Sequence, residues 1–225
     1  MKHKTNIKPW RPLYALYALI YLPWFFTLEH FITIDTPGIH ILNNAIDEKI
    51  PFCEYFIIPY LLWFLYIAAS CVFMMLYSTD SEFIRFALSL IIGMSAALII
   101  CMIYPNGITL RPHYIPDNLC GKLVKLLYHT DTSTNVFPSI HVYNSLAVHI
   151  ALNRCSTLKD HRGVRLASLV LCVLIIMSTV FLKQHSVTDV VGGIVLTAVL
   201  YIIIYIPDYK RLLHREKKSS VPDFK

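Results

Sequence analysis

The chain has 225 residues, of which 56% are hydrophobic and 15% are charged, and its mean hydropathy is +0.56. A soluble domain carries roughly 25% charged residues, so this composition excludes an ordinary soluble globule and indicates an integral membrane protein. The net charge of +6 comes from basic residues that are divided among separate predicted helix ends. That distribution fits helix flanks beside anionic lipid and disfavours nucleic-acid binding.

Six runs without Asp, Glu, Lys or Arg divide the chain, and each approaches the ~20 residues needed to cross ~30 Å of hydrocarbon. We predict a transmembrane helix in each run. The chain is then an all-α, polytopic membrane protein with six spans in a single membrane-embedded domain over residues 1–225. The first run is the shortest and contains Pro23, so a cleaved signal peptide is its alternative. The runs are 13–28, 55–77, 86–110, 132–153, 166–182 and 190–207.

Basic residues are distributed unevenly between the two predicted sides of the membrane. With both termini inside, the inner segments hold 15 Lys and Arg residues and the outer loops hold 5. The positive-inside rule therefore places both termini in the cytoplasm, with 207–225 as a basic cytoplasmic tail. The compact chain without eukaryotic sorting signals favours a bacterial plasma membrane. The sequence carries no signal for an oligomeric state.

Two features of the predicted outer loops have more than one interpretation. Cys53 and Cys120 both fall on this side, where they either pair as a disulfide or stay free thiols. The segment 33–54 is mildly amphipathic. It is either a helix that lies on the membrane surface as a lid or lipid entry lip, or a plain connector.

The predicted topology brings six polar residues to the outer ends of the helices. They come from the end of the third predicted helix, the start of the fourth, and the junction between the fifth and the sixth. Ionisable side chains at membrane depth are costly and are usually functional. Separate structural explanations for each residue do not account for their meeting at one interface. The six residues are Arg111, Ser139, His141, Lys183, His185 and Asp189.

His185 and Asp189 are four residues apart, between two long apolar runs. On a helix this spacing places both side chains on one face. The carboxylate can then take the proton on one ring nitrogen and leave the other nitrogen free to attack an electrophile. The alternative is that Asp189 caps the first turn of a helix and that His185 precedes it by chance.

The types of side chain indicate a phosphoryl site. Arg111 offers a planar set of donors that matches phosphate oxygens, and Lys183 adds a point charge. Ser139 and free amides at a helix start can donate to an anion, and His141 is a candidate general acid. Phosphoryl transfer depends mainly on positioning and charge neutralisation, so we expect no metal ion and no other cofactor. The alternatives are a positive helix flank for Arg111 and a buried core residue for His141.

Three short motifs lie in this region: YPNGITLRP at 104–112, PSIH at 138–141 and STVFLKQHSVTD at 178–189. They resemble the motifs K-x6-R-P, P-S-G-H and S-R-x5-H-x3-D of the type-2 phosphatidic acid phosphatase superfamily, the membrane lipid phosphatases related to vanadium haloperoxidases. The order and the spacing within each motif match. The resemblance covers roughly 104–193 and implies the helical bundle of that family.

The resemblance implies a role for each matching residue. His185 corresponds to the nucleophile that forms a phosphohistidine, Asp189 to the carboxylate that orients it, and His141 to the general acid. Arg111 and Ser139 correspond to ligands of the phosphate. These roles coincide with those reached from the chemistry of the side chains.

The chain departs from the family pattern at three positions. Tyr104 replaces a Lys, Thr179 replaces an Arg, and Ile140 replaces a Gly. Two cationic phosphate ligands are therefore missing, and Lys183 is a candidate replacement for one. The first and third motifs are also degenerate in a phosphotransferase branch that resembles sphingomyelin and inositol-phosphorylceramide synthases. A phosphodiester headgroup carries less charge and needs fewer cations.

Four hypotheses follow. The preferred one is a metal-independent phosphatase that acts on a lipid phosphate or diphosphate at the outer leaflet, with phosphatidic acid, phosphatidylglycerol phosphate and polyprenyl diphosphate as candidate substrates. The second is a lipid headgroup phosphotransferase. The third is a zinc enzyme with His141, His185 and Asp189 as ligands. The fourth is a non-enzymatic transporter or lipid-binding protein. The expected partners are the lipid phosphate substrate and the bilayer.

Overall fold

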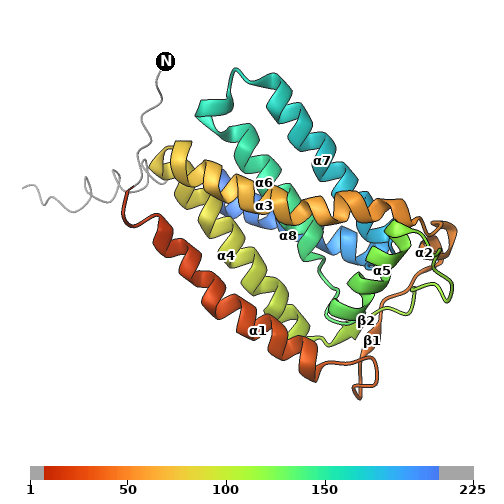
Figure 1. Cartoon of the computed structure of the whole chain (residues 1–225). Helices are drawn as coiled ribbons and strands as arrows, with labels where there is room; N and C mark the ends of the chain where they lie inside the picture. The colour runs from red at the N-terminus through yellow and green to blue at the C-terminus, as the bar shows by residue number, and fades with distance from the viewer. Residues whose placement is uncertain (1–7, 208–225) are drawn as a thin grey trace, which may run out of the picture.

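The computed structural model describes residues 8–207, which form a bundle of α-helices with one very short parallel β-pair (Figure 1). The all-α prediction is confirmed for this part of the chain. Apart from Pro207, the predicted cytoplasmic tail at 207–225 lies outside the described residues. The elements are α1 (Ala18–Phe31), β1 (His40–Ile41), α2 (Ala45–Lys49), α3 (Ile57–Tyr77), α4 (Asp80–Ile103), β2 (Asn106–Gly107), α5 (Leu119–Thr130), α6 (Ile140–Arg154), α7 (Arg162–Phe181) and α8 (Val187–Tyr205), with 3-10 turns at Pro12–Tyr17, Glu54–Phe56 and Ser156–Leu158.

Four helical segments within residues 8–207 are long and apolar enough to cross a membrane. Their outward faces carry large apolar side chains, such as Leu65 (64% exposed) and Ile103 (79% exposed). An apolar surface of this extent suits hydrocarbon and not water, which supports integration into a membrane. Six spans are not confirmed. The four segments are Glu54–Tyr77, Asp80–Ile103, Arg162–Phe181 and Val187–Tyr205.

The fourth predicted span, 132–153, is a shorter helix in the structure. α6 has 15 residues and begins at Ile140, so it is about 22 Å long, less than the ~30 Å of a hydrocarbon core. Pro138 disfavours helical backbone at the residue before it, and Ser139 caps the helix. The lack of charge in the first part of the run did not distinguish extended chain from helix.

The first predicted span, 13–28, is divided between two kinds of helix. Pro12–Tyr17 forms a 3-10 helix, and α1 follows with 14 residues and Pro23 inside it. A proline inside a helix removes one backbone hydrogen bond. α1 alone is about 21 Å long, which is too short for a complete span.

α6 lies at the centre of the bundle, in contact with α3, α4, α7 and α8. Two glycines permit its close approach to neighbouring helices. A methyl group at Gly93 of α4 would lie 2.0 Å from Tyr143 of α6, and one at Gly193 of α8 would lie 2.8 Å from the carbonyl oxygen of Ser139. Small residues at such crossings let helix backbones pack tightly. The predicted active-site stretch at the start of α6 is therefore held directly against α8.

One end of the bundle carries β1, β2, α2, α5 and the turn between α7 and α8 (Figure 1); we call it the site end. At the opposite end, Lys8 forms an ion pair with Asp80, and Arg85 donates to the carbonyl of Pro207 at 3.1 Å. Residues 8 and 207 therefore lie at the same end of the bundle, away from the site end.

All six cysteines lie within the described residues and all are free thiols. The structure thus has no Cys53–Cys120 disulfide, and the free-thiol alternative holds. Cys53 instead donates its backbone N–H to the carbonyl of Phe181 at 3.1 Å, which ties the segment before α3 to the end of α7.

Candidate active site

The turn between α7 and α8 places His185. α7 ends in a Schellman motif, in which Lys183 N–H donates to the Val180 carbonyl at 3.1 Å and Gln184 N–H donates to the Thr179 carbonyl at 3.0 Å. Lys183 has the left-handed conformation that this motif requires, with φ +54°. His185 N–H also donates to the Thr179 carbonyl, at 3.1 Å. The backbone N–H groups of three consecutive residues, 183–185, are therefore fixed before α8 begins.

His185 lies outside α8 and not on its face. Ser186 is the N-cap of α8, and Asp189 is the third helical residue, whose Oδ2 accepts from Ser186 N–H at 2.8 Å in a capping box. The expectation that both side chains share one helix face is therefore wrong, because the helix begins after His185. The Asp189 carboxylate both caps the helix and faces the imidazole. Helix capping and proximity to His185, predicted as alternatives, are therefore both present in one arrangement.

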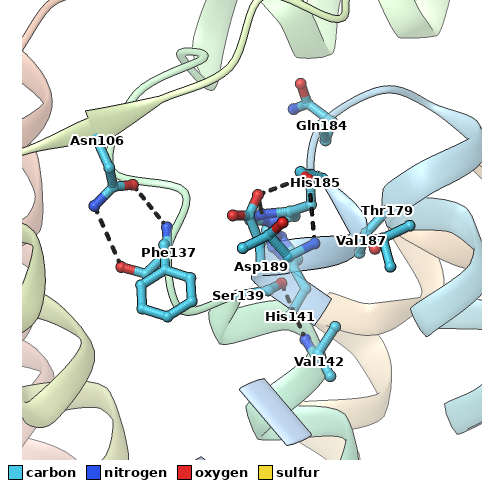
Figure 2. Close-up of polar contacts among 12 residues, drawn as sticks. Asn106, Phe137, Ser139, His141, Val142, Thr179, Gln184, His185, Val187 and Asp189 are labelled. Carbon is cyan, nitrogen blue, oxygen red and sulfur yellow. Dashed lines mark hydrogen bonds and ion pairs between the residues drawn. The ribbon is translucent and has the colours of Figure 1, made fainter. Parts of the chain in front are cut away.

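Two histidines and one aspartate lie next to one another at the centre of the site (Figure 2). Asp189 Oδ2 lies 3.4 Å from His185 Nδ1, and His185 Nε2 lies 3.2 Å from His141 Nδ1. His141 and His185 are buried, and Asp189 is fully buried. Each nitrogen of His185 thus has a different neighbour, which is the arrangement needed for an oriented nucleophile beside a second acid–base group.

Ser139 joins the beginnings of α6 and α8. Its Oγ accepts from Val142 N–H at 3.4 Å as the N-cap of α6, and its own N–H donates to the Asp189 carbonyl at 3.1 Å. Asn106 supports this region from β2: its Oδ1 accepts from Phe137 N–H at 2.8 Å (Figure 2). The sequence analysis did not identify Asn106, although its position after proline in YPNG was a turn signal.

Arg111 reaches the turn that carries His185 through Gln184. Its guanidinium donates to the carbonyls of Tyr128 at 3.0 Å and Asp131 at 2.5 Å, and to Gln184 Oε1 at 2.7 Å. It also lies 4.3 Å from the centre of the Tyr128 ring. Burial lowers the pKa of Arg111. The structure therefore places this predicted phosphate ligand next to the residue that precedes His185.

Lys183 contacts α2. Its Nζ donates to the carbonyls of Asp47 at 2.6 Å and Ile50 at 2.5 Å. Burial lowers the pKa of this ammonium. Among residues 8–207, its side-chain hydrogen bonds go to these carbonyls and not to the other predicted site residues. The other four predicted residues thus gather around His185 and its neighbours, whereas the Lys183 ammonium is directed to α2.

α2 and the residue before it hold the start of α8. Asp47 Oδ1 accepts from Val187 N–H at 2.8 Å, and Asp47 Oδ2 accepts from Ser186 Oγ at 2.7 Å. Asn44 donates to the hydroxyls of Ser186 at 3.0 Å and Thr188 at 3.1 Å. The segment predicted as a lid or a plain connector is therefore hydrogen-bonded to the start of α8, directly after His185.

Asp131 is the site residue that the sequence analysis missed most clearly. Its Oδ2 accepts from Tyr60 Oη at 2.8 Å and from Gln184 Nε2 at 3.0 Å. Burial raises the pKa of this carboxyl, and the hydrogen bond from Tyr60 lowers it by less. The available signal was its position as a charged residue directly before the uncharged run 132–153.

The positions of the two missing family cations are occupied by uncharged side chains. Tyr104 stacks on His40, with ring centres 4.0 Å apart. Thr179 is fully buried, and its hydroxyl donates to the Ile176 carbonyl at 2.8 Å. Within residues 8–207, no three His, Cys, Asp or Glu side chains are grouped as a metal site requires.

A family model described as the PAP2 superfamily matches residues 83–212. The match covers more than half of the chain, so the chain belongs to the PAP2 superfamily. This membership supports a phosphatase- or phosphotransferase-type function on lipids in general terms. No curated protein and no solved structure matches the chain.

Proposed function

We propose that the protein is a metal-independent lipid phosphate or diphosphate phosphatase that works through a phosphohistidine at His185. The observation that carries this proposal is the succession of contacts Asp189–His185–His141, with Oδ2–Nδ1 and Nε2–Nδ1 distances of 3.4 Å and 3.2 Å. The negative charge of Asp189, 3.4 Å from His185 Nδ1, favours a proton on that nitrogen, which leaves a lone pair on Nε2. The phosphoryl group enters between Nε2 and His141, in place of their direct contact.

The reaction has two balanced steps. His185 Nε2 attacks phosphorus, the N–P bond forms, and the P–O bond to the lipid breaks as protonated His141 gives its Nδ1 proton to the leaving oxygen. Water then attacks phosphorus, His141 takes the proton of that water, the N–P bond breaks, and phosphate leaves. Arg111 and the amides at the start of α6 neutralise charge on the non-bridging oxygens.

A lipid substrate is supported by an apolar groove beside the site. The groove has a volume of about 810 Å³ and runs along α8, where residues 44–46, residues 137–138 and Ile100 of α4 complete its lining. Pro138 and Thr188 line it and are the sequence neighbours of Ser139 and Asp189. We propose that the hydrocarbon chain of the substrate lies in this groove while its phosphate reaches His185.

The outer leaflet is the proposed side of action. The predicted distribution of basic residues places the chain ends inside, and residues 8 and 207 lie at the end of the bundle opposite the site. A phosphate at the site end would then be reached from the outer face of the plasma membrane.

The test is phosphate release by the purified protein in detergent with EDTA present. Phosphatidic acid, phosphatidylglycerol phosphate and polyprenyl diphosphate are offered in parallel. We expect EDTA-resistant release from at least one lipid, and an acid-labile, base-stable phosphoenzyme. His185→Ala should show neither. Near wild-type turnover in His185→Ala would overturn the proposal.

Headgroup transfer is the second candidate, and the position of Lys183 favours it. With this ammonium directed to α2 and uncharged residues at 104 and 179, Arg111 is the predicted cationic ligand that lies beside the nucleophile segment. A phosphodiester carries less charge than a phosphomonoester and suits such a site. Phosphate release from no offered lipid, together with transfer from a phospholipid donor to a lipid alcohol, would support this candidate.

A further inference from the structure

Gln184 has an orientation that its neighbours determine uniquely. Its Oε1 accepts from Arg111 at 2.7 Å, and its Nε2 donates to Asp131 at 3.0 Å. A guanidinium can only donate and a carboxylate can only accept, so the amide cannot be flipped without losing both bonds. Gln184 is buried, and the Schellman motif fixes its backbone directly before His185.

Asp131 is fixed from both sides as well. Its Oδ2 accepts from Tyr60 in addition to Gln184, and its backbone carbonyl accepts from Arg111 at 2.5 Å. The Tyr60 ring is fully buried, with its centre 4.7 Å from that of the His141 ring. A continuous set of hydrogen bonds thus runs from Tyr60, beside the general acid, through Asp131 and Gln184 to Arg111.

Arg111 still has a donor available. Its Nε is buried and has no hydrogen-bond partner among the described residues. A buried donor without a partner is costly, and an anion bound at this position would satisfy it. An arginine side chain that is already held in place loses less conformational freedom when it binds phosphate.

We propose that Gln184 and Asp131 are positioning residues that hold the Arg111 guanidinium for the phosphoryl group, with Tyr60 fixing Asp131. The proposal rests on the proposed function in that it takes Arg111 as a phosphate ligand. Gln184 and Asp131 act only through Arg111. Replacing them should therefore change activity only when Arg111 is present.

A double-mutant cycle tests this dependence. Gln184→Leu keeps a similar volume and removes both amide bonds. In the wild-type background it should lower kcat/KM by roughly 10- to 100-fold, the loss expected for a hydrogen bond to a charged group. In the Arg111→Ala background it should lower the residual kcat/KM by no more than about twofold. The same fold loss of kcat/KM from Gln184→Leu in both backgrounds would overturn the proposal.

Substitutions of Asp131 test whether this residue holds the Gln184 amide in its orientation. One carbonyl oxygen of asparagine can accept from both Tyr60 and Gln184, so Asp131→Asn should keep kcat/KM within about threefold of wild type. Asp131→Ala leaves Gln184 unheld and should lose roughly 10-fold or more. Equal losses in Asp131→Asn and Asp131→Ala would overturn the positioning role.

A control variant separates positioning from general loss of stability. Ser168→Ala removes bonds to Tyr66 at 2.6 Å and His149 at 3.1 Å, about 21 Å along α7 from the site turn. It should lower the unfolding temperature and leave kcat/KM of the folded protein unchanged. A fall in kcat/KM as large as that of Gln184→Leu would overturn the positioning interpretation.

Inorganic phosphate supplies a readout that does not need turnover. It should raise the unfolding temperature of the full-length wild-type protein, and this shift should be lost in Arg111→Ala and reduced in Gln184→Leu. If phosphate stabilises the wild-type protein but the protein releases none from lipids, the proposed function is contradicted. The shifts in Arg111→Ala and Gln184→Leu then still decide the positioning role. Absence of any phosphate-induced shift in the wild type would overturn the positioning proposal itself.

Discussion

Two aspartates from different segments, Asp47 and Asp131, hold the two sides of the turn between α7 and α8, and they do so in different ways. Asp47 accepts from the Val187 N–H and the Ser186 hydroxyl, so it determines where α8 begins. Asp131 accepts from the side chains of Tyr60 and Gln184. The two carboxylates therefore have different tasks: Asp47 binds a backbone N–H and a capping hydroxyl at the start of α8, and Asp131 fixes the direction of two longer side chains.

The two aspartates also differ in how many oxygens they use. Asp47 uses both: Oδ1 for Val187, and Oδ2 for Ser186 and the Asn44 N–H at 2.9 Å. Both side-chain bonds that Asp131 accepts go to Oδ2. An asparagine has one acceptor oxygen and can replace Asp131 but not Asp47. Aspartate-to-asparagine substitutions therefore distinguish the two sites.

The largest expected effect is at Asp189, the carboxylate next to His185 in the turn that Asp47 and Asp131 hold. Asp189→Asn keeps an oxygen that can cap Ser186 and removes the charge that, in the proposed mechanism, favours the required tautomer of His185. We expect a fold of normal stability and a loss of about 1,000-fold or more in kcat, by analogy with other oriented histidines. Phosphate release and thermal unfolding check this, with Asp189→Ala as the variant that also loses the cap. Full activity in Asp189→Asn would leave capping as the only role of the residue.

The next effect concerns stability. Asp47→Ala leaves the donors at Ser186 and Val187 without partners and should lower the free energy of unfolding by about 2–4 kcal/mol. The remaining folded protein should keep kcat/KM within about threefold of wild type. Denaturation in detergent and kinetics on the same sample measure both quantities. Asp47→Asn should be nearly as unstable as Asp47→Ala, and a stable Asp47→Asn variant would contradict the two-oxygen description.

A smaller effect is the pH dependence of stability. Burial raises the pKa of Asp131 above its ordinary value of 3.8, so the folded state binds a proton more tightly than the unfolded state. Stability should therefore fall as the pH rises from 3.8 through the folded pKa, and this slope should disappear in Asp131→Asn. Unfolding free energies measured across this range check the sign. An unchanged slope in Asp131→Asn would assign the titration to another group.

The smallest effect on turnover is expected at Lys183. Glycine adopts a positive φ without strain, so Lys183→Gly keeps the turn while losing the two bonds to α2. kcat/KM should stay within about threefold of wild type, with a modest loss of stability. The matched variant Lys183→Ala should be less stable than Lys183→Gly. A tenfold or larger increase in KM in both variants would identify Lys183 as a phosphate ligand after all.

Motif spacing predicted which residues meet. The spacing within each motif is local to a short stretch of sequence, and the apolar runs alternate in direction along the chain. Arg111, Ser139, His141, His185 and Asp189 lie in three short stretches, and the order of the helices was sufficient to place all three at one end. Helix lengths were predicted less well. The run 132–153 is uncharged throughout, yet helix begins only after Pro138.

The sequence by itself determined the membrane class, the superfamily and the chemical types of the site residues, because these depend on composition and on spacing within short motifs. Only the tertiary structure decided which cation lies beside the segment that carries His185. Lys183 is two residues from His185, yet the left-handed turn sends its ammonium to α2. Arg111 is 73 positions from Gln184 and is bonded to it. Contacts between distant segments depend on how the helices pack, which no single stretch of the chain specifies.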